Sequence, residues 1–164
     1  MRPLLSGGTL GVRTDMMFRS ADFSIRRSQW GQLPLREFFI NGKTIQDLFR
    51  RVERDRVPLL DTCVSPLGWL DAAGDQVSLA RFLPDGPGDF PNGHRAILVC
   101  RECGSFGCGA LTARIATVGG DIVWSDWLWQ VDYDDAMRDD FAGRIPAFAF
   151  PRDAYLQVLR EAVV

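Results

Sequence analysis

The sequence predicts a single α+β domain, with an antiparallel sheet and a few helices. Two kinds of pattern indicate this class. In residues 111–116, the apolar Leu111, Ala113 and Ile115 alternate with Thr112, Arg114 and Ala116, as in a half-buried strand. A glycine-rich turn then leads to a second apolar run at 122–129. Residues 44–54 and 151–162 repeat their apolar side chains at helical spacing. A length of 164 residues is enough for one domain with its own hydrophobic core.

The chain begins with a segment that shows no structural period. Residues 1–17 are rich in glycine, so we expect a loose N-terminal extension before a domain that spans residues 18–164. The pattern from 18 onward is mixed, and a short buried strand at 38–40 is its clearest element. Asn41-Gly42 then predicts a turn.

The predicted helix at 44–54 has both a start signal and a period. Thr44 stands in the capping position, with Asp47 three residues later. The apolar residues that follow recur at helical spacing: Ile45, Leu48, Phe49 and Val52. Residues 77–82 show no clear pattern, and the proline- and glycine-rich stretch 84–93 predicts a loop.

Strand signals dominate the second half of the chain. An apolar run at 96–99 leads into a cysteine motif, and the alternating strand 111–116 follows it. Gly119-Gly120-Asp121 predicts a hairpin turn to the return strand. The cysteine motif is therefore expected to form the loop between two antiparallel strands. A further strand at 147–150 leads to Pro151, which suits the first turn of the closing helix.

The cysteine motif carries the strongest chemical signal. Three of the four cysteines fall within nine residues, and the spacing Cys100-x-x-Cys103-Gly104 matches the turn that aims two thiolates at one ion in zinc ribbons. Cys108 is the predicted third ligand. The fourth would come from Cys63, His94 or a carboxylate, and the predicted Zn²⁺ ligands are Cys100, Cys103, Cys108 and His94.

Two other interpretations of the motif stay open. Closely spaced thiols can carry out redox chemistry, although the glycines after Cys103 favour a loop over the helix start of a thioredoxin-type site. The cysteines and glycines can also simply pack a crowded turn, because free cysteine often behaves as a small buried apolar residue.

A contact surface is predicted from charge and aromatic residues. The net charge is −2, and residues 121–140 hold seven aspartates against the one Arg138. Alternation places Trp124, Asp126 and Leu128 on one face of their strand and Trp127 and Trp129 on the other, where these two belong either to the core or to an exposed strip. The predicted partner-binding residues are Asp126, Trp127, Trp129, Asp132, Tyr133, Asp134 and Asp135.

Several classes of function find no support in the sequence. No apolar run approaches the length of a membrane span, and the N-terminus has no apolar signal region, so a cytoplasmic protein is expected. Phosphate-binding glycine motifs are missing, which argues against nucleotide binding. The arginines are scattered in an acidic chain, so a nucleic-acid partner is not expected.

The motif resembles that of an uncharacterised family of small bacterial proteins, in which C-P-E-C-G-D-x-G-C-G-A precedes W-x-D-F and a tyrosine. The matching residues begin with Cys100, Cys103, Gly104, Gly107, Cys108, Gly109 and Ala110 and continue with Trp124, Asp126 and Tyr133. Arg101, Ser105 and Trp127 depart from the family pattern. Members of this family are sometimes labelled oxidoreductases, so the resemblance implies little about mechanism.

These observations favour a non-catalytic protein that binds another macromolecule. The cysteine hairpin would be a structural, zinc-bound element, and the acidic and aromatic region would contact a basic protein, as in an inhibitor or immunity-type protein. The alternative is a thiol-dependent oxidoreductase that uses the clustered cysteines, with Asp126 as a proton carrier.

Overall fold

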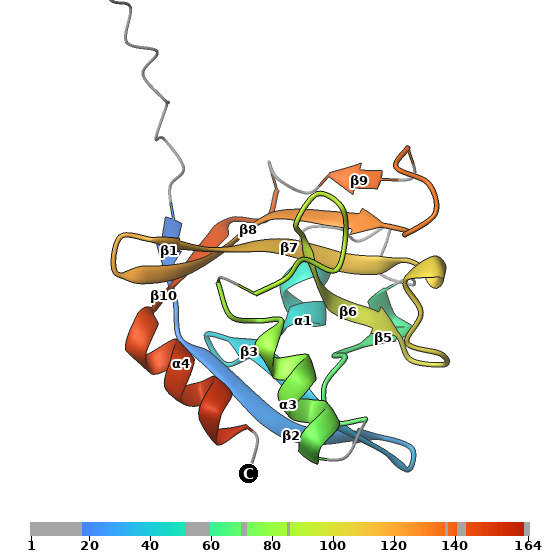
Figure 1. Cartoon of the computed structure of the whole chain (residues 1–164), viewed down its shortest axis with the longest axis horizontal. Coiled ribbons are helices and arrows are strands. Elements are labelled where there is room, and N and C mark those ends of the chain that lie inside the picture. The colour runs from blue at the N-terminus through green and yellow to red at the C-terminus, as the bar shows by residue number, and fades with distance from the viewer. Residues whose placement is uncertain are drawn as a thin grey trace, which may run out of the picture.

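Two β-sheets, one of seven strands and one of three, form the framework of the protein, and helices pack beside them (Figure 1). The structure is a computed structural model that describes residues 18–51, 60–69, 72–84, 86–136, 138–140 and 144–162. The α+β class is confirmed, in one compact domain. The predicted N-terminal extension, residues 1–17, lies outside the described residues.

The large sheet has the strand order β1-β10-β8-β7-β6-β5, with β9 paired to β8. Its pairs are antiparallel except that β1 runs parallel to β10, so the sheet is mixed and not purely antiparallel as predicted. The strands are β1 (Phe18–Ser20), β5 (Cys63–Val64), β6 (Arg95–Cys100), β7 (Ala110–Val118), β8 (Asp121–Gln130), β9 (Arg138–Asp140) and β10 (Ala147–Pro151).

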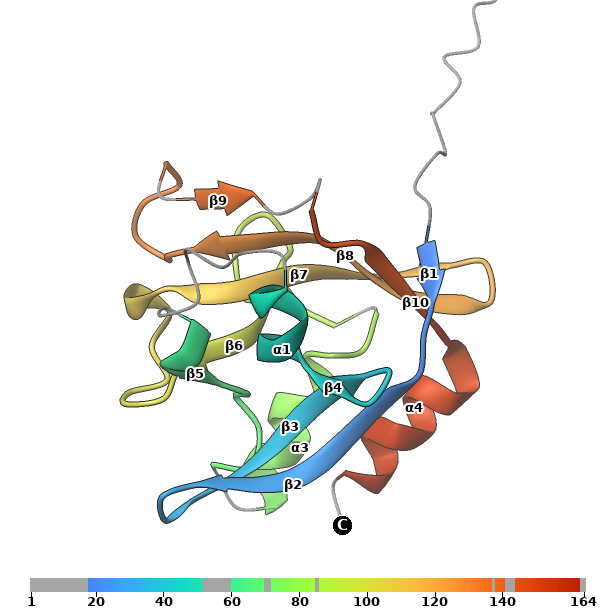
Figure 2. The ribbon, with the colours of Figure 1, turned by 180° about the vertical axis from the view of Figure 1, so that it is seen from behind.

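The small sheet is antiparallel and has the order β2-β3-β4. Its strands are β2 (Phe23–Trp30), β3 (Leu33–Ile40) and β4 (Lys43–Thr44), and the helices are α1 (Ile45–Arg50), α3 (Ala72–Ala80) and α4 (Arg152–Glu161). The helices α3 and α4 lie on the side of the molecule seen in Figure 1, whereas α1 and β4 lie on the side seen in Figure 2. No helix within the described ranges is long and apolar enough to cross a membrane.

Local signals located the helices α1 and α4. The backbone N–H of Asp47 donates to Thr44 Oγ1 at 3.2 Å, which confirms the predicted cap, and α1 begins at the next residue. Arg51 caps its other end, and residues 52–54 of the predicted helix lie outside the described residues. The closing helix is confirmed as α4, with Pro151 at its start.

The β2–β3 hairpin was largely missed from the sequence, which predicted only residues 38–40 of it. The outer half of β2 is exposed on both faces, so its polar residues follow no alternation that would mark a strand. The helix α3 was also missed, because residues 77–82 show no helical period in the sequence.

A β-bulge interrupts the pairing of β7 with β8. Thr112 lies opposite Leu128, but Arg114 lies opposite Ser125, so Ala113 faces two residues of β8. The first of these, Asp126, has a φ of 53°, in the left-handed region that aspartate tolerates better than most residues. Its carboxylate accepts a hydrogen bond from Arg114 Nε at 3.1 Å.

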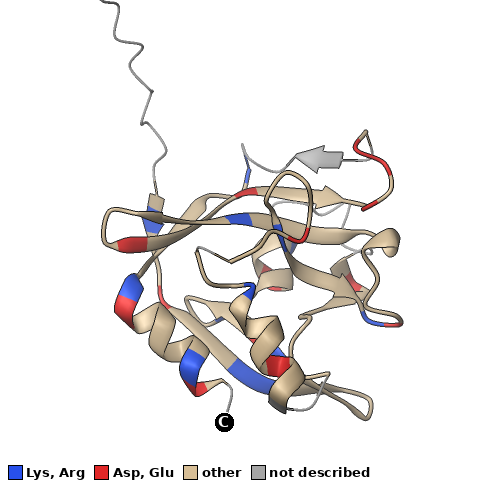
Figure 3. Cartoon of the chain, in the orientation of Figure 1, with Lys and Arg blue, Asp and Glu red and all other residues tan. Residues whose placement is uncertain are grey.

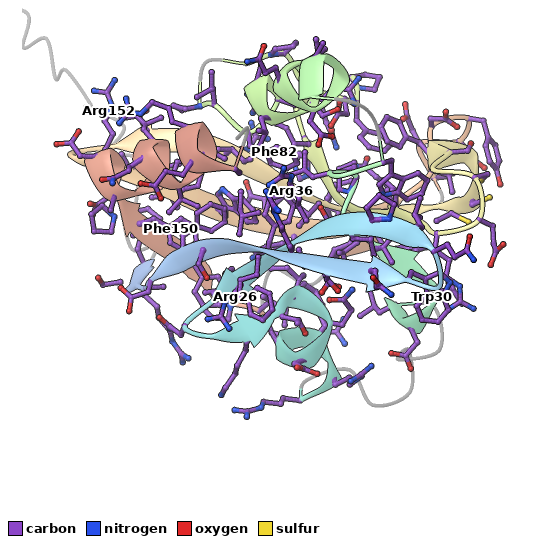
Figure 4. The ribbon with its side chains drawn as sticks, turned by 90° about the horizontal axis from the view of Figure 1, so that it is seen from below. Arg26, Trp30, Arg36, Phe82, Phe150 and Arg152 are labelled. Atoms are coloured by element: carbon purple, nitrogen blue, oxygen red, sulfur yellow. The ribbon has the colours of Figure 1, made fainter. Side chains whose placement is uncertain are left out.

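The bulge brings Trp124 and Trp127 to the same face of β8, and both are buried in the main core. Trp124 is fully buried and lies at the centre of an aromatic cluster. Its ring centroid lies 5.3 Å from that of Phe23, 5.4 Å from Phe38 and 5.8 Å from Phe150. These partners come from both sheets, so the aromatic cluster joins the two sheets (Figure 4 labels Phe150).

A buried arginine organises the connection between α3 and β6. Arg95 is 5% exposed, and its guanidinium donates to backbone carbonyls before and after it in the chain. These belong to Arg81, Leu83, Pro84, Gly86, Gly93 and Ile115. Since a buried charge is costly unless its hydrogen bonds are satisfied, these carbonyls are what makes the position tenable.

A buried hydroxyl gives a direct test of this packing. Tyr155 donates from its hydroxyl to Phe82 O at 2.7 Å and accepts from Trp124 Nε1 at 3.1 Å. The Tyr155→Phe change leaves both groups buried without this partner, so we expect a loss of about 1–3 kcal/mol in the free energy of unfolding, measured in urea. The matched Tyr133→Phe change, at a side chain that is 67% exposed, should alter it by less than about 0.5 kcal/mol. Equal effects at both sites would contradict the assigned hydrogen bonds.

Candidate metal centre

Three cysteine sulfurs lie together in the loop that connects β6 to β7. The sequence predicted this position of the cysteine motif, between two antiparallel strands. We call residues 100–109 the cysteine loop; it includes the short 3₁₀ turn η1 (Phe106–Cys108). The Sγ atoms of Cys100, Cys103 and Cys108 all lie within 4.8 Å of one another, and those of Cys103 and Cys108 are 3.5 Å apart. Tetrahedral zinc with Zn–S bonds of about 2.3 Å separates its sulfurs by roughly 3.8 Å. The three cysteines are therefore close enough to hold a metal ion.

Two glycines give the cysteine loop its shape. Gly104 has a φ of 66°, and its N–H donates to Cys100 O at 2.8 Å, which closes the turn between the first two cysteines. Gly109 has a φ of 94°. A Cβ at Gly104 would lie 3.1 Å from the ring of Trp69, and one at Gly109 would lie 2.4 Å from the ring of Trp129. The cysteine loop is thus held against two tryptophan rings.

Backbone N–H groups also point at the sulfurs. Ser105 N donates to Cys103 Sγ at 3.4 Å. The N–H of Glu102, the largest influence, and that of Cys103 stabilise the thiolate of Cys100 and hold its pKa below the ordinary value. Contact with the Cys103 sulfur, and then with that of Cys100, raises the pKa of Cys108 to about 11. The loop therefore favours a thiolate at Cys100, and a bound cation would displace the protons from its neighbours.

Arg101 attaches the cysteine loop to two other parts of the fold. Its N–H donates to Thr62 O at 3.1 Å, and its guanidinium donates to Asp61 O at 3.3 Å. The guanidinium carbon also lies 4.1 Å from the ring centroid of Trp30, at the end of β2 (labelled in Figure 4).

His94 is not brought to the sulfurs, which corrects its prediction as a zinc ligand. It is 2% exposed, and its Nδ1 lies 3.1 Å from Thr112 Oγ1. That hydroxyl donates its one hydrogen to Leu128 O and accepts from Gln130 Nε2, so Nδ1 is the donor in this pair. Because the His94 ring is buried, it forms its hydrogen bond within this polar network. Among the described residues, no further His, Cys, Asp or Glu joins the three cysteines of the cluster.

Cys63 also stays outside the cluster, although it lies directly opposite Cys100 in the β5–β6 pair. It is 4% exposed in the main core, and burial raises its pKa to about 11. A buried protonated thiol of this kind behaves as a small apolar side chain.

The predicted contact surface is partly corrected. Trp127 is 1% exposed, because the bulge turns it into the core, and it cannot contact a partner. Trp129 follows on the same face and is half-buried against the main core and Gly109. Asp126 keeps a half-exposed side chain, paired with Arg114.

The other predicted contact residues are exposed, and the first of them, Asp132, lies close to the cysteine loop. Asp132, Tyr133, Asp134 and Asp135 form what we call the acidic turn, after β8 (Figure 3). An oxygen of Asp132 lies 3.7 Å from the position of a Cβ on Gly107, so the acidic turn borders the cysteine loop.

The sequence did not indicate the roles of Trp69 and Trp129. Each lies over a glycine of the motif, but it comes from a segment about 20 or more positions away along the chain, and no spacing rule links a ring to a distant glycine. The fold and the site define a mixed α+β domain with a three-cysteine cluster that can hold a metal. Comparisons of the chain with family models, curated proteins and solved structures found no match.

The contact between Gly109 and Trp129 can be tested with a matched pair of variants. Both Gly109→Ala and Gly119→Ala place an alanine at positive φ, but Gly109, with φ 94° and ψ 148°, lies outside the αL region and also has the ring of Trp129 in the way. We expect Gly119→Ala to cost about 1 kcal/mol of unfolding free energy, and Gly109→Ala to cost about 1–3 kcal/mol more. Chemical denaturation of both variants measures the difference, and equal costs would show that the ring does not constrain the loop.

Proposed function

We propose that this protein is a non-catalytic, zinc-binding interaction protein of the inhibitor or immunity type. The observation that carries the proposal is the convergence of three cysteine sulfurs in a loop whose backbone is already folded around them. Thiolates are preferred ligands of Zn²⁺, and a loop fixed in advance loses little conformational entropy when the metal binds.

A structural role for the metal follows from what surrounds the loop. Two tryptophan rings and the contacts of Arg101 fix it to the domain. The acidic turn borders it, and Tyr133 in that turn is 67% exposed. A metal in the loop would stiffen the edge of a surface that carries negative charge and an exposed aromatic ring. Such a surface suits a basic protein partner, because complementary charge speeds association and aromatic side chains anchor interfaces.

Zinc binding is tested by metal content and thiol accessibility. We expect protein purified without tags or chelators to contain one zinc per chain, with Cys100, Cys103 and Cys108 protected from alkylation. Cys103→Ser should lose the metal, while Cys63→Ala, which removes a thiol outside the cluster, should keep it. Retention of zinc by the Cys103→Ser variant would contradict the assignment of these ligands.

The second function that a specific observation favours is thiol redox chemistry. The sulfurs of the exposed Cys103 and Cys108 lie 3.5 Å apart, and a modest movement would allow a disulfide. The same purified protein discriminates between the two functions. Zinc-free chains that reversibly form a Cys103–Cys108 disulfide with oxidised glutathione would favour the oxidoreductase and count against the structural metal.

The interaction surface is tested by reversing charges on the acidic turn and comparing the result with an equal charge change elsewhere. A partner captured from native lysate should bind the double variant Asp132→Lys and Asp134→Lys at least tenfold more weakly, mainly through a slower association rate. The control, Asp121→Lys with Glu161→Lys, adds the same four charges away from the acidic turn and should bind normally. Equal losses in both variants would mean that net charge, and not this surface, governs binding.

A further inference from the structure

A cavity opens beside the cysteine loop, on the side of the second hydrophobic cluster. Its volume is about 290 Å³. Cys103, Gly104 and Phe106 line it from the cysteine loop, and Trp69 and Val99 line it from the neighbouring segments. This size lies at the lower end of small-molecule sites, so the cavity suits a ligand of one or two rings.

The apolar walls of the cavity are incompletely covered by the protein. The second cluster consists of Phe90, Ala96, Val99 and Ala110, and Trp69 and Phe106 pack against it while staying only partly buried. The ring of Phe106 stacks on Phe90 with centroids 5.0 Å apart, and Trp69 Nε1 donates to Ser65 O at 2.9 Å. Both rings are therefore fixed by their other contacts, and their remaining surface is available to a planar ligand.

The polar side of the cavity is formed by Ser78 and Arg81, at the end of α3 and just after it. Arg81 pairs with Asp89 through Nη1 at 3.4 Å, and its side chain is 45% exposed. A guanidinium carries five N–H donors in a planar fork, and among the described residues the ion pair with Asp89 engages one of its nitrogens, so other donors can reach a carboxylate on a ligand. The Ser78 hydroxyl adds a donor or an acceptor on the same side.

We propose that this cavity binds a small aromatic carboxylate, with its ring between Trp69 and Phe106 and its carboxylate on Arg81. The walls are protein groups alone, so the proposal goes beyond the proposed zinc and partner binding and does not require either. Because Gly104 and Phe106 belong to the cysteine loop, a ligand in the cavity would contact the loop directly.

The test uses 2-naphthoate as the probe, with 2-naphthamide as its uncharged counterpart. We expect 2-naphthoate to bind the full-length protein with a Kd below about 1 mM, and at least fivefold more tightly than the amide. Amide signals of Gly104 and Phe106 should shift during an NMR titration. The titration is run on protein as purified and on chelator-treated protein, so a failure of zinc binding and a failure of the cavity give different results.

Two substitutions on α3 supply the matched control. Ser78→Phe fills the cavity and should weaken 2-naphthoate binding at least tenfold, whereas Val77→Phe adds the same ring at a side chain that is 68% exposed and does not line the cavity. Arg81→Gln should remove the preference for naphthoate over the amide. Binding that survives Ser78→Phe, or equal affinity of the unmodified protein for both probes, would overturn the proposal.

Discussion

The left-handed backbone at Asp126 determines the direction of the side chains that follow it in β8. Strict alternation would turn Trp127 and Trp129 away from the face that Trp124 occupies, because a shift of one residue exchanges the two faces of a strand. The bulge inserts one residue, so the rings of Trp124 and Trp127 enter the same core. Trp129 then reaches Gly109 at the end of the cysteine loop. One backbone conformation therefore sets both the aromatic core and a wall of the three-cysteine cluster.

Apolar contacts fix the shape of the cysteine loop as much as its own hydrogen bonds do. Trp129 packs on the side of the main core, whereas Trp69 and Phe106 belong to the second cluster. The strands β6 and β7 contribute residues to both clusters, such as Ala110 to the second cluster and Leu111 to the main core. The loop is anchored where these two packed regions meet. A metal would bind to a scaffold that the hydrophobic effect has already shaped, unlike a zinc finger, which folds only with its ion.

Local chemistry explains how far the sequence could predict this structure. The Thr44 cap, the turn at 119–120 and the C-x-x-C-G spacing each depend on residues a few positions apart, and the structure confirms the elements they indicate. The bulge at Asp126 depends on the pairing of β8 with β7. The residues around Asp126 carry no sequence signal that the side chains after it change to the other face of β8. His94 was a reasonable ligand by distance along the chain, but its burial against Thr112 is a tertiary effect. The cavity beside Cys103 likewise combines residues from distant segments.

The hydrogen bonds from Arg95 to carbonyls of the loop before β6 affect the free energy needed to open that loop. A surface loop rich in proline and glycine is ordinarily among the first segments to open and to be cut by proteases. Here, opening would break the hydrogen bonds of a buried guanidinium to the carbonyls of Gly86 and Gly93. Local opening of this loop should therefore cost more than its composition suggests. The loop would belong to the same cooperative unit as β6 and β7, with slow amide exchange where its composition suggests fast exchange.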